Sequence, residues 1–249
     1  MKNTVHFILQ GKGGIGKSFV SSLLAQYLKS KTGNLKAFDT DQVNTTFAFY
    51  KALGVEQISL TTGFNEIDPK GFDIMIEKLI TEDGPFVIDN GANTFSPLLS
   101  YMVESDIFSL LRDSGKQVYV HTIVGGGDTM ADTANGFNSI ARGIGDTPLV
   151  LWLNEHFGLM KTVEGKDFID TKVFKTHEDR LHGIISLVAR NPKTTGKDIN
   201  TMNAKRLTFD EVKESKEFMT VEKQRIHIVA KEVFAQLAQI EFLPMDRRK

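Results

Sequence analysis

The chain has 249 residues, a formal net charge of -1 and no cysteine. The lack of cysteine excludes disulfides, thiolate zinc sites and cysteine-ligated iron–sulfur clusters. The neutral total charge differs from the basic excess typical of nucleic-acid-binding proteins, although a local basic patch is compatible with it. No apolar run approaches the roughly 20 residues that span a bilayer, and no secretory signal is visible. We therefore expect a cytoplasmic protein without a membrane span, folded as a single domain over residues 1–249.

Apolar runs of strand length alternate with segments of helical periodicity, which is typical of βαβ units and a parallel sheet. The pattern predicts strands at 5–9, 36–39, 86–89, 117–124, 149–153 and 184–189. It predicts helices at 16–29, 72–80, 96–111, after Asp128, at 161–177 and at 221–240. Residues 191–215 are polar and irregular in pattern, so we expect no regular element there. The sequence thus predicts a doubly wound α/β fold with a mostly parallel sheet.

A glycine-rich segment follows the first predicted strand and opens the first predicted helix. It reads Gly11-Lys12-Gly13-Gly14-Ile15-Gly16-Lys17-Ser18 and matches the Walker A pattern G-x-x-x-x-G-K-[S/T]. Glycines permit positive φ and let backbone N–H groups approach phosphates, while the N-terminus of the following helix attracts anions. Lys17 is expected to contact the β and γ phosphates, and the Ser18 hydroxyl to bind Mg²⁺. We predict a P-loop NTPase that binds ATP and Mg²⁺ through residues 11–18 and the adjoining Phe19.

Aspartates follow two of the predicted strands. Asp39 and Asp41 come after the second strand, and Asp89 ends the third in the manner of a Walker B motif. The carboxyl ends of parallel strands lie at the edge of the sheet that also carries the phosphate loop. Carboxylates there can orient a metal-bound or attacking water, and Asp89 is expected to hold Mg²⁺ through a water. Turn formation or helix capping is the alternative role for Asp39 and Asp41.

The second lysine of the loop, Lys12, produces the pattern Lys-Gly-Gly-x-Gly-Lys-Ser. This pattern resembles the deviant Walker A motif of the MinD/ParA superfamily of P-loop ATPases. The resemblance implies that Lys12 reaches across a homodimer to the partner's nucleotide, as an arginine finger does. It also implies that Asp39 lies in the outer shell of Mg²⁺ and that Asp41 positions the attacking water. Asn154, which follows the strand 149–153, is where several relatives read the adenine edge; an ordinary turn residue is the alternative.

A narrower resemblance is carried by several short stretches within the first 160 residues. They are Leu9 to Gly14, Asp39 to Phe47, Tyr50 to Leu53, Val87 to Ala92 and Trp152 to Glu155. Together they resemble TraL-type proteins of plasmid conjugal transfer. The resemblance implies an accessory ATPase of a conjugation or type IV secretion system, with a protein partner from that system. We expect a dimeric switch with slow hydrolysis that its partner stimulates.

Three other functions use the same phosphate loop. A ParA-like segregation protein would bind DNA non-specifically through cations, for which the sequence offers Lys193, Lys197, Lys205 and Arg206, with acidic residues close behind. A MinD-like positioning protein would need a C-terminal amphipathic basic helix, whereas the tail 243–249 is charged but has no apolar face. A metabolic kinase or ligase of related fold would have no need of Lys12.

Overall fold

The computed structural model describes residues 3–60, 67–68 and 70–242. Within them, seven strands form one sheet in the order β3-β2-β4-β1-β5-β6-β7. The strands are β1 (Thr4–Ile8), β2 (Lys36–Asp39), β3 (Glu56–Gln57), β4 (Phe86–Asp89), β5 (Gln117–Gly125), β6 (Leu149–Asn154) and β7 (Leu181–Leu187). Every pairing between them is parallel, so the mostly parallel sheet expected from the sequence is fully parallel.

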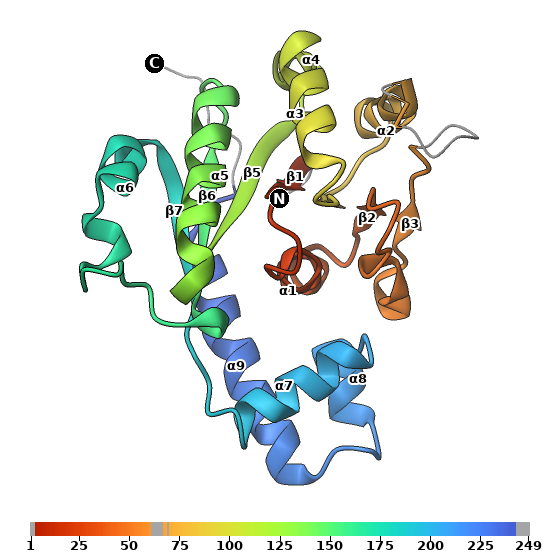
Figure 1. Cartoon of the computed structure of the whole chain (residues 1–249). Helices are drawn as coiled ribbons and strands as arrows, with labels where there is room; N and C mark the ends of the chain where they lie inside the picture. The colour runs from red at the N-terminus through yellow and green to blue at the C-terminus, as the bar shows by residue number, and fades with distance from the viewer. Residues whose placement is uncertain (1–2, 61–66, 69, 243–249) are drawn as a thin grey trace.

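Helices cover both faces of this sheet (Figure 1). They are α1 (Lys17–Thr32), α2 (Lys70–Thr81), α3 (Phe95–Glu104), α4 (Ile107–Asp113), α5 (Met130–Gly143), α6 (Lys172–His177), α7 (Thr195–Ala204), α8 (Phe209–Glu214) and α9 (Thr220–Gln239). Helices α2 to α5 pack on one face, and α1 and α9 pack on the other. Parallel strands connected by helices on alternate faces form the doubly wound arrangement that the sequence predicts.

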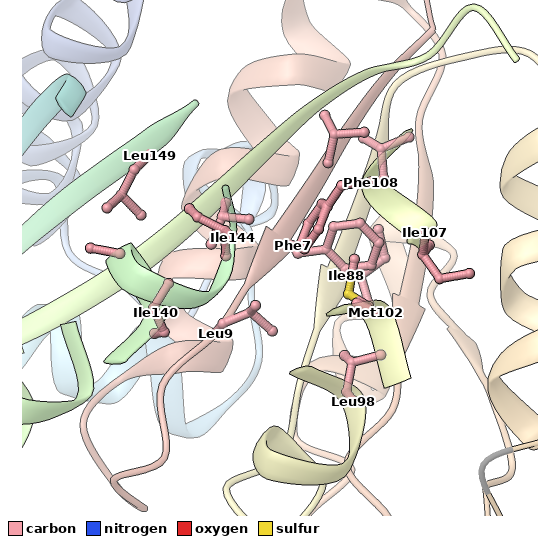
Figure 2. Close-up of a cluster of buried hydrophobic side chains, with 14 of the residues drawn as sticks. Phe7, Leu9, Ile88, Leu98, Met102, Ile107, Phe108, Ile140, Ile144 and Leu149 are labelled. Atoms are coloured by element: carbon pink, nitrogen blue, oxygen red, sulfur yellow. The ribbon is translucent and has the colours of Figure 1, made fainter. Parts of the chain in front are cut away.

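The strands are apolar on both faces because each face is covered. Along β1, Phe7 points into the core beneath α3 and α4, whereas Ile8 points toward α1. Figure 2 shows Phe7 beside Ile88 of β4 and close to Met102 of α3 and Phe108 of α4. The central strands are thereby fixed from both sides, which holds the loops at their carboxyl ends in place.

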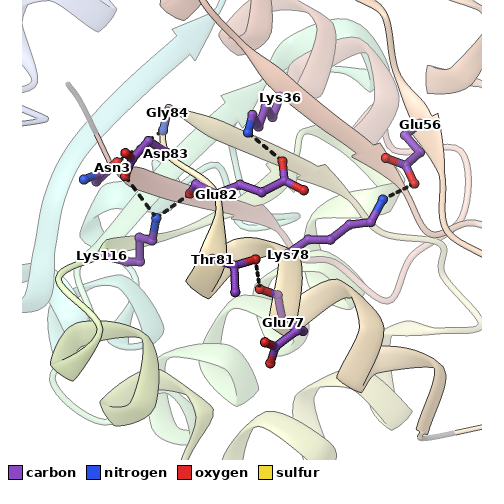
Figure 3. Close-up of polar contacts among 10 residues, drawn as sticks. All are labelled: Asn3, Lys36, Glu56, Glu77, Lys78, Thr81, Glu82, Asp83, Gly84 and Lys116. Carbon is purple, nitrogen blue, oxygen red and sulfur yellow. Dashed lines mark hydrogen bonds and ion pairs between the residues drawn. The ribbon is translucent and has the colours of Figure 1, made fainter.

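The opposite, amino end of the sheet is held by charged side chains (Figure 3). The Lys36 ammonium lies 2.5 Å from a carboxylate oxygen of Glu82, which follows α2. Lys116, before β5, donates to the Glu82 carbonyl oxygen at 2.5 Å and lies 4.0 Å from the Asp83 carboxylate. These contacts join the starts of β2, β4 and β5 and leave the carboxyl edge to the glycine-rich loop.

Three sequence predictions about helices were wrong. The helix expected at 96–111 is divided into α3 and α4, because Asp106 adopts the left-handed conformation, with φ of 46°. Of the helix expected at 161–177, the structure contains only α6 and a short 3-10 turn at Phe168–Asp170.

The third error concerns 191–215, where no regular element was expected and α7 and α8 are found. Helix α8 begins with a capping box in which the Thr208 hydroxyl accepts from the Glu211 N–H and the Glu211 carboxylate accepts from the Thr208 N–H. The apolar residues of α7 and α8 are few; they form a small core with Phe218 and α9, and Ile199 and Phe209 also pack against the core beneath α1 and α9. Because α7 and α8 have so few apolar residues, these residues do not recur with the spacing by which a helix is recognised in a sequence.

No helix in the described part of the chain is long and apolar enough to cross a bilayer. The tail 243–249, in which a MinD-like protein would need an amphipathic basic helix, lies outside the described residues.

Candidate functional site

The phosphate loop connects β1 to α1 at the carboxyl edge of the sheet. Gly14 and Gly16 have φ of 71° and 101°, values that side-chain-bearing residues rarely adopt. No side chain caps the start of α1, so its first N–H groups are available to an anion. The Lys17 ammonium donates to the Lys12 carbonyl oxygen at 3.0 Å and is largely buried. Burial lowers the pKa of Lys17, against the opposing effect of Asp89 and Asp41.

A cavity of about 520 Å³ opens in front of this loop. The predicted site residues that line it are Gly13, Gly14, Gly16, Lys17, Ser18, Phe19 and Asp41. Of the remaining residues of the predicted loop, Ile15 and Gly11 are packed against other parts of the chain. Ile15 is buried in the core with α1, and Gly11 lies so close to the Phe95 ring that a Cβ there would be 3.1 Å from it.

Two buried carboxylates lie behind the cavity. Asp39 and Asp89 are register partners at the ends of β2 and β4, and both are almost fully buried. Burial raises the pKa of Asp89 to about 7, against hydrogen bonds from Ser18 and Ser21 that lower it. Burial also raises the pKa of Asp39 to about 6, against hydrogen bonds from the backbone N–H groups of Asp41 and Ala48. Both carboxyl groups have raised pKa values, and a nearby cation would stabilise their ionised forms. The pair therefore favours the binding of a cation.

Asp41 lies at the cavity wall in a tight turn. One of its carboxylate oxygens accepts from the N–H groups of Val43 and Asn44, each at 2.9 Å. The loop after β4 comes close to it, since a Cβ on Gly91 would lie 2.7 Å from the Asp41 Cγ. The neighbouring Asn90 is buried and accepts from the Thr40 and Thr94 hydroxyls, which ties β2, β4 and α3 together.

Lys12 points along the surface of its own chain. Its ammonium lies 2.8 Å from an Asp132 carboxylate oxygen on α5, and both side chains are largely exposed. Asp132 was not predicted as a site residue, because nothing in the sequence distinguishes it from any acidic residue in the first turn of a helix. The role of Lys12 toward a second subunit stays a prediction.

A second cavity of about 440 Å³ adjoins the first and shares Gly14, Gly16, Phe19 and Asn203 with it. Its further lining includes Asn154, Phe157, Leu187, Pro192, Ile199, Asn200 and Val233. The Asn154 amide N–H donates to the Ile15 carbonyl oxygen at 3.1 Å, and its oxygen accepts from the His156 N–H at 3.1 Å. Asn154 thus holds the phosphate loop to the end of β6, and its predicted contact with adenine would use only the remaining N–H and lone pair of the amide.

Sequence reasoning missed several residues that line the cavity, and two of them, Asn203 and Arg206, come from a distant part of the chain. Both lie at the end of α7 and line the cavity beside Lys17, Ser18 and Asp41. Arg206 appeared in the sequence analysis only as a cation for DNA. Since no regular element was expected at 191–215, no pattern placed these residues next to the phosphate loop.

The fully parallel sheet, with the Walker A loop between β1 and α1 and helices on both faces, has the P-loop NTPase fold of the MinD/ParA type. The MinD cell division protein of Aquifex aeolicus superposes with a TM-score of 0.51, covering 98% of this chain and 100% of that chain. The sequences are 14% identical, so the likeness concerns the fold alone.

Two proteins of Escherichia coli named Protein TraL are much closer in sequence. They are 37% and 36% identical to this chain over 234 residues, which cover 94% of the chain and 96% of each relative. No protein-family model matches the chain. The chain belongs to the TraL family.

Proposed function

We propose that the protein binds and hydrolyses ATP with Mg²⁺ in the cytoplasm and works as a dimeric switch accessory to plasmid conjugal transfer or type IV secretion. One observation carries the proposal: Lys17 and the free N-terminus of α1 line one cavity, and two buried carboxylates lie behind it, one of them hydrogen-bonded to Ser18. An anion in the cavity would meet the lysine and the N–H groups, and the negative charge of the carboxylates would attract a cation beside Ser18. This combination suits a metal-bound nucleoside triphosphate and few other ligands.

The donor set fits Mg²⁺. Mg²⁺ prefers hard oxygen ligands and retains several waters. The Ser18 hydroxyl lines the cavity and hydrogen-bonds Asp89, while Asp39 lies beside Asp89 in the sheet. Ser18 would hold the metal directly, and Asp39 and Asp89 would hold it through water. When bound, the metal would neutralise charge on the β and γ phosphates.

The other site residues supply binding and orientation. Lys17 and the N–H groups at the start of α1 would hold the β and γ phosphates. Asp41, at the cavity wall, would orient the attacking water by accepting its proton in a hydrogen bond. Lys12 is exposed enough to leave Asp132 and reach the nucleotide of a second subunit, where it would stabilise charge on the transferring phosphoryl group.

Membership of the TraL family supports a role in conjugation, with a component of the transfer or secretion machinery as the protein partner. The DNA-segregation alternative has less support. Of the four cations suggested for DNA, Lys205 forms an ion pair with Glu217 and Arg206 lines the cavity. Retardation of random-sequence DNA that depends on ATP would favour that alternative.

The test is a titration of fluorescent ATP and ADP into the purified protein with Mg²⁺. We expect Lys17→Ala to weaken ATP binding by roughly tenfold to hundredfold, because it removes a charge-assisted hydrogen bond to phosphate. Lys166→Ala is the matched control, since Lys166 is exposed and lines neither cavity. Failure of the wild-type protein to bind ATP would refute the proposal.

A further inference from the structure

We propose that Arg206 is a phosphate-binding residue of the nucleotide site, contributed by the same chain, and that Asn203 and Tyr50 position it. The inference rests on the proposed nucleotide-binding function. Arg206 and Asn203 line the cavity that Lys17, Ser18 and Asp41 also line. Arg206 therefore lies at the wall of the cavity in which the phosphates are expected.

The position of Arg206 in the backbone is unusual for an arginine. Helix α7 ends in a Schellman motif, in which Leu207 N–H donates to the Met202 carbonyl and Arg206 N–H to the Asn203 carbonyl, both at 3.1 Å. Arg206 occupies its left-handed position with φ of 55°. Glycine is the residue that this position favours, because a Cβ is strained there. Local structure alone does not account for an arginine at this point of the chain.

The guanidinium of Arg206 is anchored through Nη1, and other N–H donors of the group remain available. Its Nη1 donates to the Asn203 backbone oxygen at 2.5 Å and lies 3.5 Å from the Asn203 side-chain oxygen. A guanidinium has five N–H donors, so several remain beyond those directed to Asn203 and to the Tyr50 hydroxyl. Among the ion pairs of the described residues none includes Arg206. A positive charge without a carboxylate partner at the wall of this cavity is suited to a phosphate oxygen.

Asn203 is itself held by the segment that follows Asp39 and Asp41. The Tyr50 hydroxyl donates to the Asn203 side-chain oxygen at 2.6 Å, and the Tyr50 side chain is fully buried. Helix α8 is also tied to the phosphate-loop helix, because the Phe209 N–H donates to the Gln26 side-chain oxygen at 2.7 Å. Figure 1 shows α7 and α8 together beside α9, away from the sheet. A phosphate bound to Arg206 would link these helices to the nucleotide.

The first experiment measures ATP and ADP affinity by calorimetry on the full chain with Mg²⁺. We expect Arg206→Gln to weaken binding by roughly tenfold to hundredfold, the effect of one charge-assisted hydrogen bond. Arg206→Lys should fall in between, because it keeps the charge and loses the planar fork. Lys205→Gln removes the same charge one residue away, at a side chain that pairs with Glu217 and lines neither cavity, and should change affinity less than twofold.

Arg206→Gly separates phosphate binding from a purely structural role. Glycine suits the left-handed position, so the Tm of the nucleotide-free variant should equal or exceed that of the wild type. ATP affinity should nevertheless fall as far as in Arg206→Gln. Tyr50→Phe, which removes the hydroxyl that contacts Asn203 and Arg206, should weaken ATP binding by roughly twofold to tenfold.

Two results would overturn the inference. One is wild-type ATP affinity in both Arg206→Gln and Arg206→Gly while Lys17→Ala loses binding, which would leave the proposed function intact. The other is a loss of affinity only in those Arg206 variants whose Tm is lowered, which would make the residue structural. If the wild-type protein bound no nucleotide, the proposed function would fail together with the inference.

Discussion

Lys12, which we propose acts on the nucleotide of a second subunit, forms an ion pair with Asp132 of its own chain. Both side chains of this pair are largely exposed. Exposed ion pairs contribute about 0.2–1 kcal/mol, much less than a charge-assisted contact with a phosphate in a closed interface. Asp132 therefore holds Lys12 weakly and competes little with a nucleotide.

Loss of this ion pair should favour the dimer. In Asp132→Asn the lysine no longer has to leave a carboxylate, so the ATP-bound protein should dimerise up to about fivefold more tightly. Sedimentation velocity across a concentration series with ATP and Mg²⁺ measures this shift. Asp128→Asn is the control, because Asp128 is an exposed carboxylate near the start of the same helix. A dimer weakened by Asp132→Asn would contradict the expectation.

Two histidines that the sequence leaves scattered form a buried chain of hydrogen bonds. Trp152 Nε1 donates to His121 Nδ1, so neutral His121 carries its proton on Nε2 and donates to His6 Nδ1. His6 can then donate from Nε2 to the Thr4 hydroxyl, and each of these contacts is 3.0 Å long. Every ring nitrogen is satisfied while both rings are neutral, and protonation of either would break the chain.

This chain of bonds predicts acid sensitivity. Burial lowers the pKa of His121 to about 3 and that of His6 well below its usual value, with the neighbouring His182 acting on His121 in the same direction. An unfolded histidine titrates near about 6.5, so below that pH the unfolded state binds more protons. The histidines contribute fully to stability above about pH 6.5, and the contribution is lost progressively as the pH falls toward the folded pKa.

Urea unfolding at pH 7.5 and pH 5.5 measures the effect. Between these values His121 should account for a loss of about 1.4 kcal/mol, so the pH-dependent change should be smaller by that amount in His121→Gln. The raised pKa values of Asp39 and Asp89 act in the opposite sense, which is why the difference between variant and wild type is the informative quantity. The exposed His227→Gln should behave as the wild type.

At the scale of elements, the loop between β4 and α3 sets the position of Asp41. An added Cβ at Gly91 would lie 2.7 Å from the Asp41 Cγ and 2.8 Å from the Asn93 side-chain oxygen. Such contacts are too short for carbon, so a side chain at Gly91 must displace the Asp41 carboxylate. The loop and the turn after β2 therefore form one unit at the cavity wall.

Gly91→Ala should separate hydrolysis from binding. We expect single-turnover ATP hydrolysis to fall by roughly tenfold to hundredfold, because a displacement of about 1 Å at a water-orienting group has an effect of that size. ADP affinity should stay within about threefold, since no contact of Lys17 or the phosphate loop with the nucleotide is altered. Gly143→Ala is the control, because a Cβ there makes only ordinary contacts at 3.7 Å. Equal losses in hydrolysis and ADP binding would argue against this role of Asp41.

At the scale of the whole molecule, apolar side chains are exposed beside the cavity. Val43 lines the cavity and is 71% exposed, and Phe49, in the short 3-10 helix Phe47–Phe49 that follows, is 61% exposed. A second subunit that covers the nucleotide would bury both side chains. Burial of a large apolar side chain stabilises an interface by about 1.5–3 kcal/mol.

The proposed dimer should therefore depend on Phe49 and on the metal. With ATP and Mg²⁺, light scattering should record a dimer for the wild type and a monomer for Phe49→Asp, while ATP affinity changes less than about threefold. Removal of Mg²⁺ with EDTA should return the wild type to the monomer. Ile74→Asp is the control, because Ile74 is 60% exposed but lies on α2. A dimer unaffected by both treatments would place the interface elsewhere.

Most of the sheet and the centre of the site could be predicted from sequence because their signals are local. Residues 11–18 are contiguous, and Asp39 and Asp89 are marked by the apolar strands they end. The same reasoning failed for two features, one that depends on distant contacts and one that depends on the conformation of a single residue. Helices α7 and α8 depend on a small core shared with α9, and the division between α3 and α4 depends on a left-handed Asp106. Neither feature leaves a periodic pattern in its own segment.

The sequence by itself determines the class of the protein and its phosphate loop. A phosphate loop needs only neighbouring residues in a set order, so its signal lies in one short contiguous stretch. The partners of those residues come from distant parts of the chain. Packing alone brings Asp132 to Lys12, Asn203 to Tyr50, and Arg206 to the cavity wall. Side-chain contacts depend on distance in space, and the folded chain brings α5 and α7 to the loop.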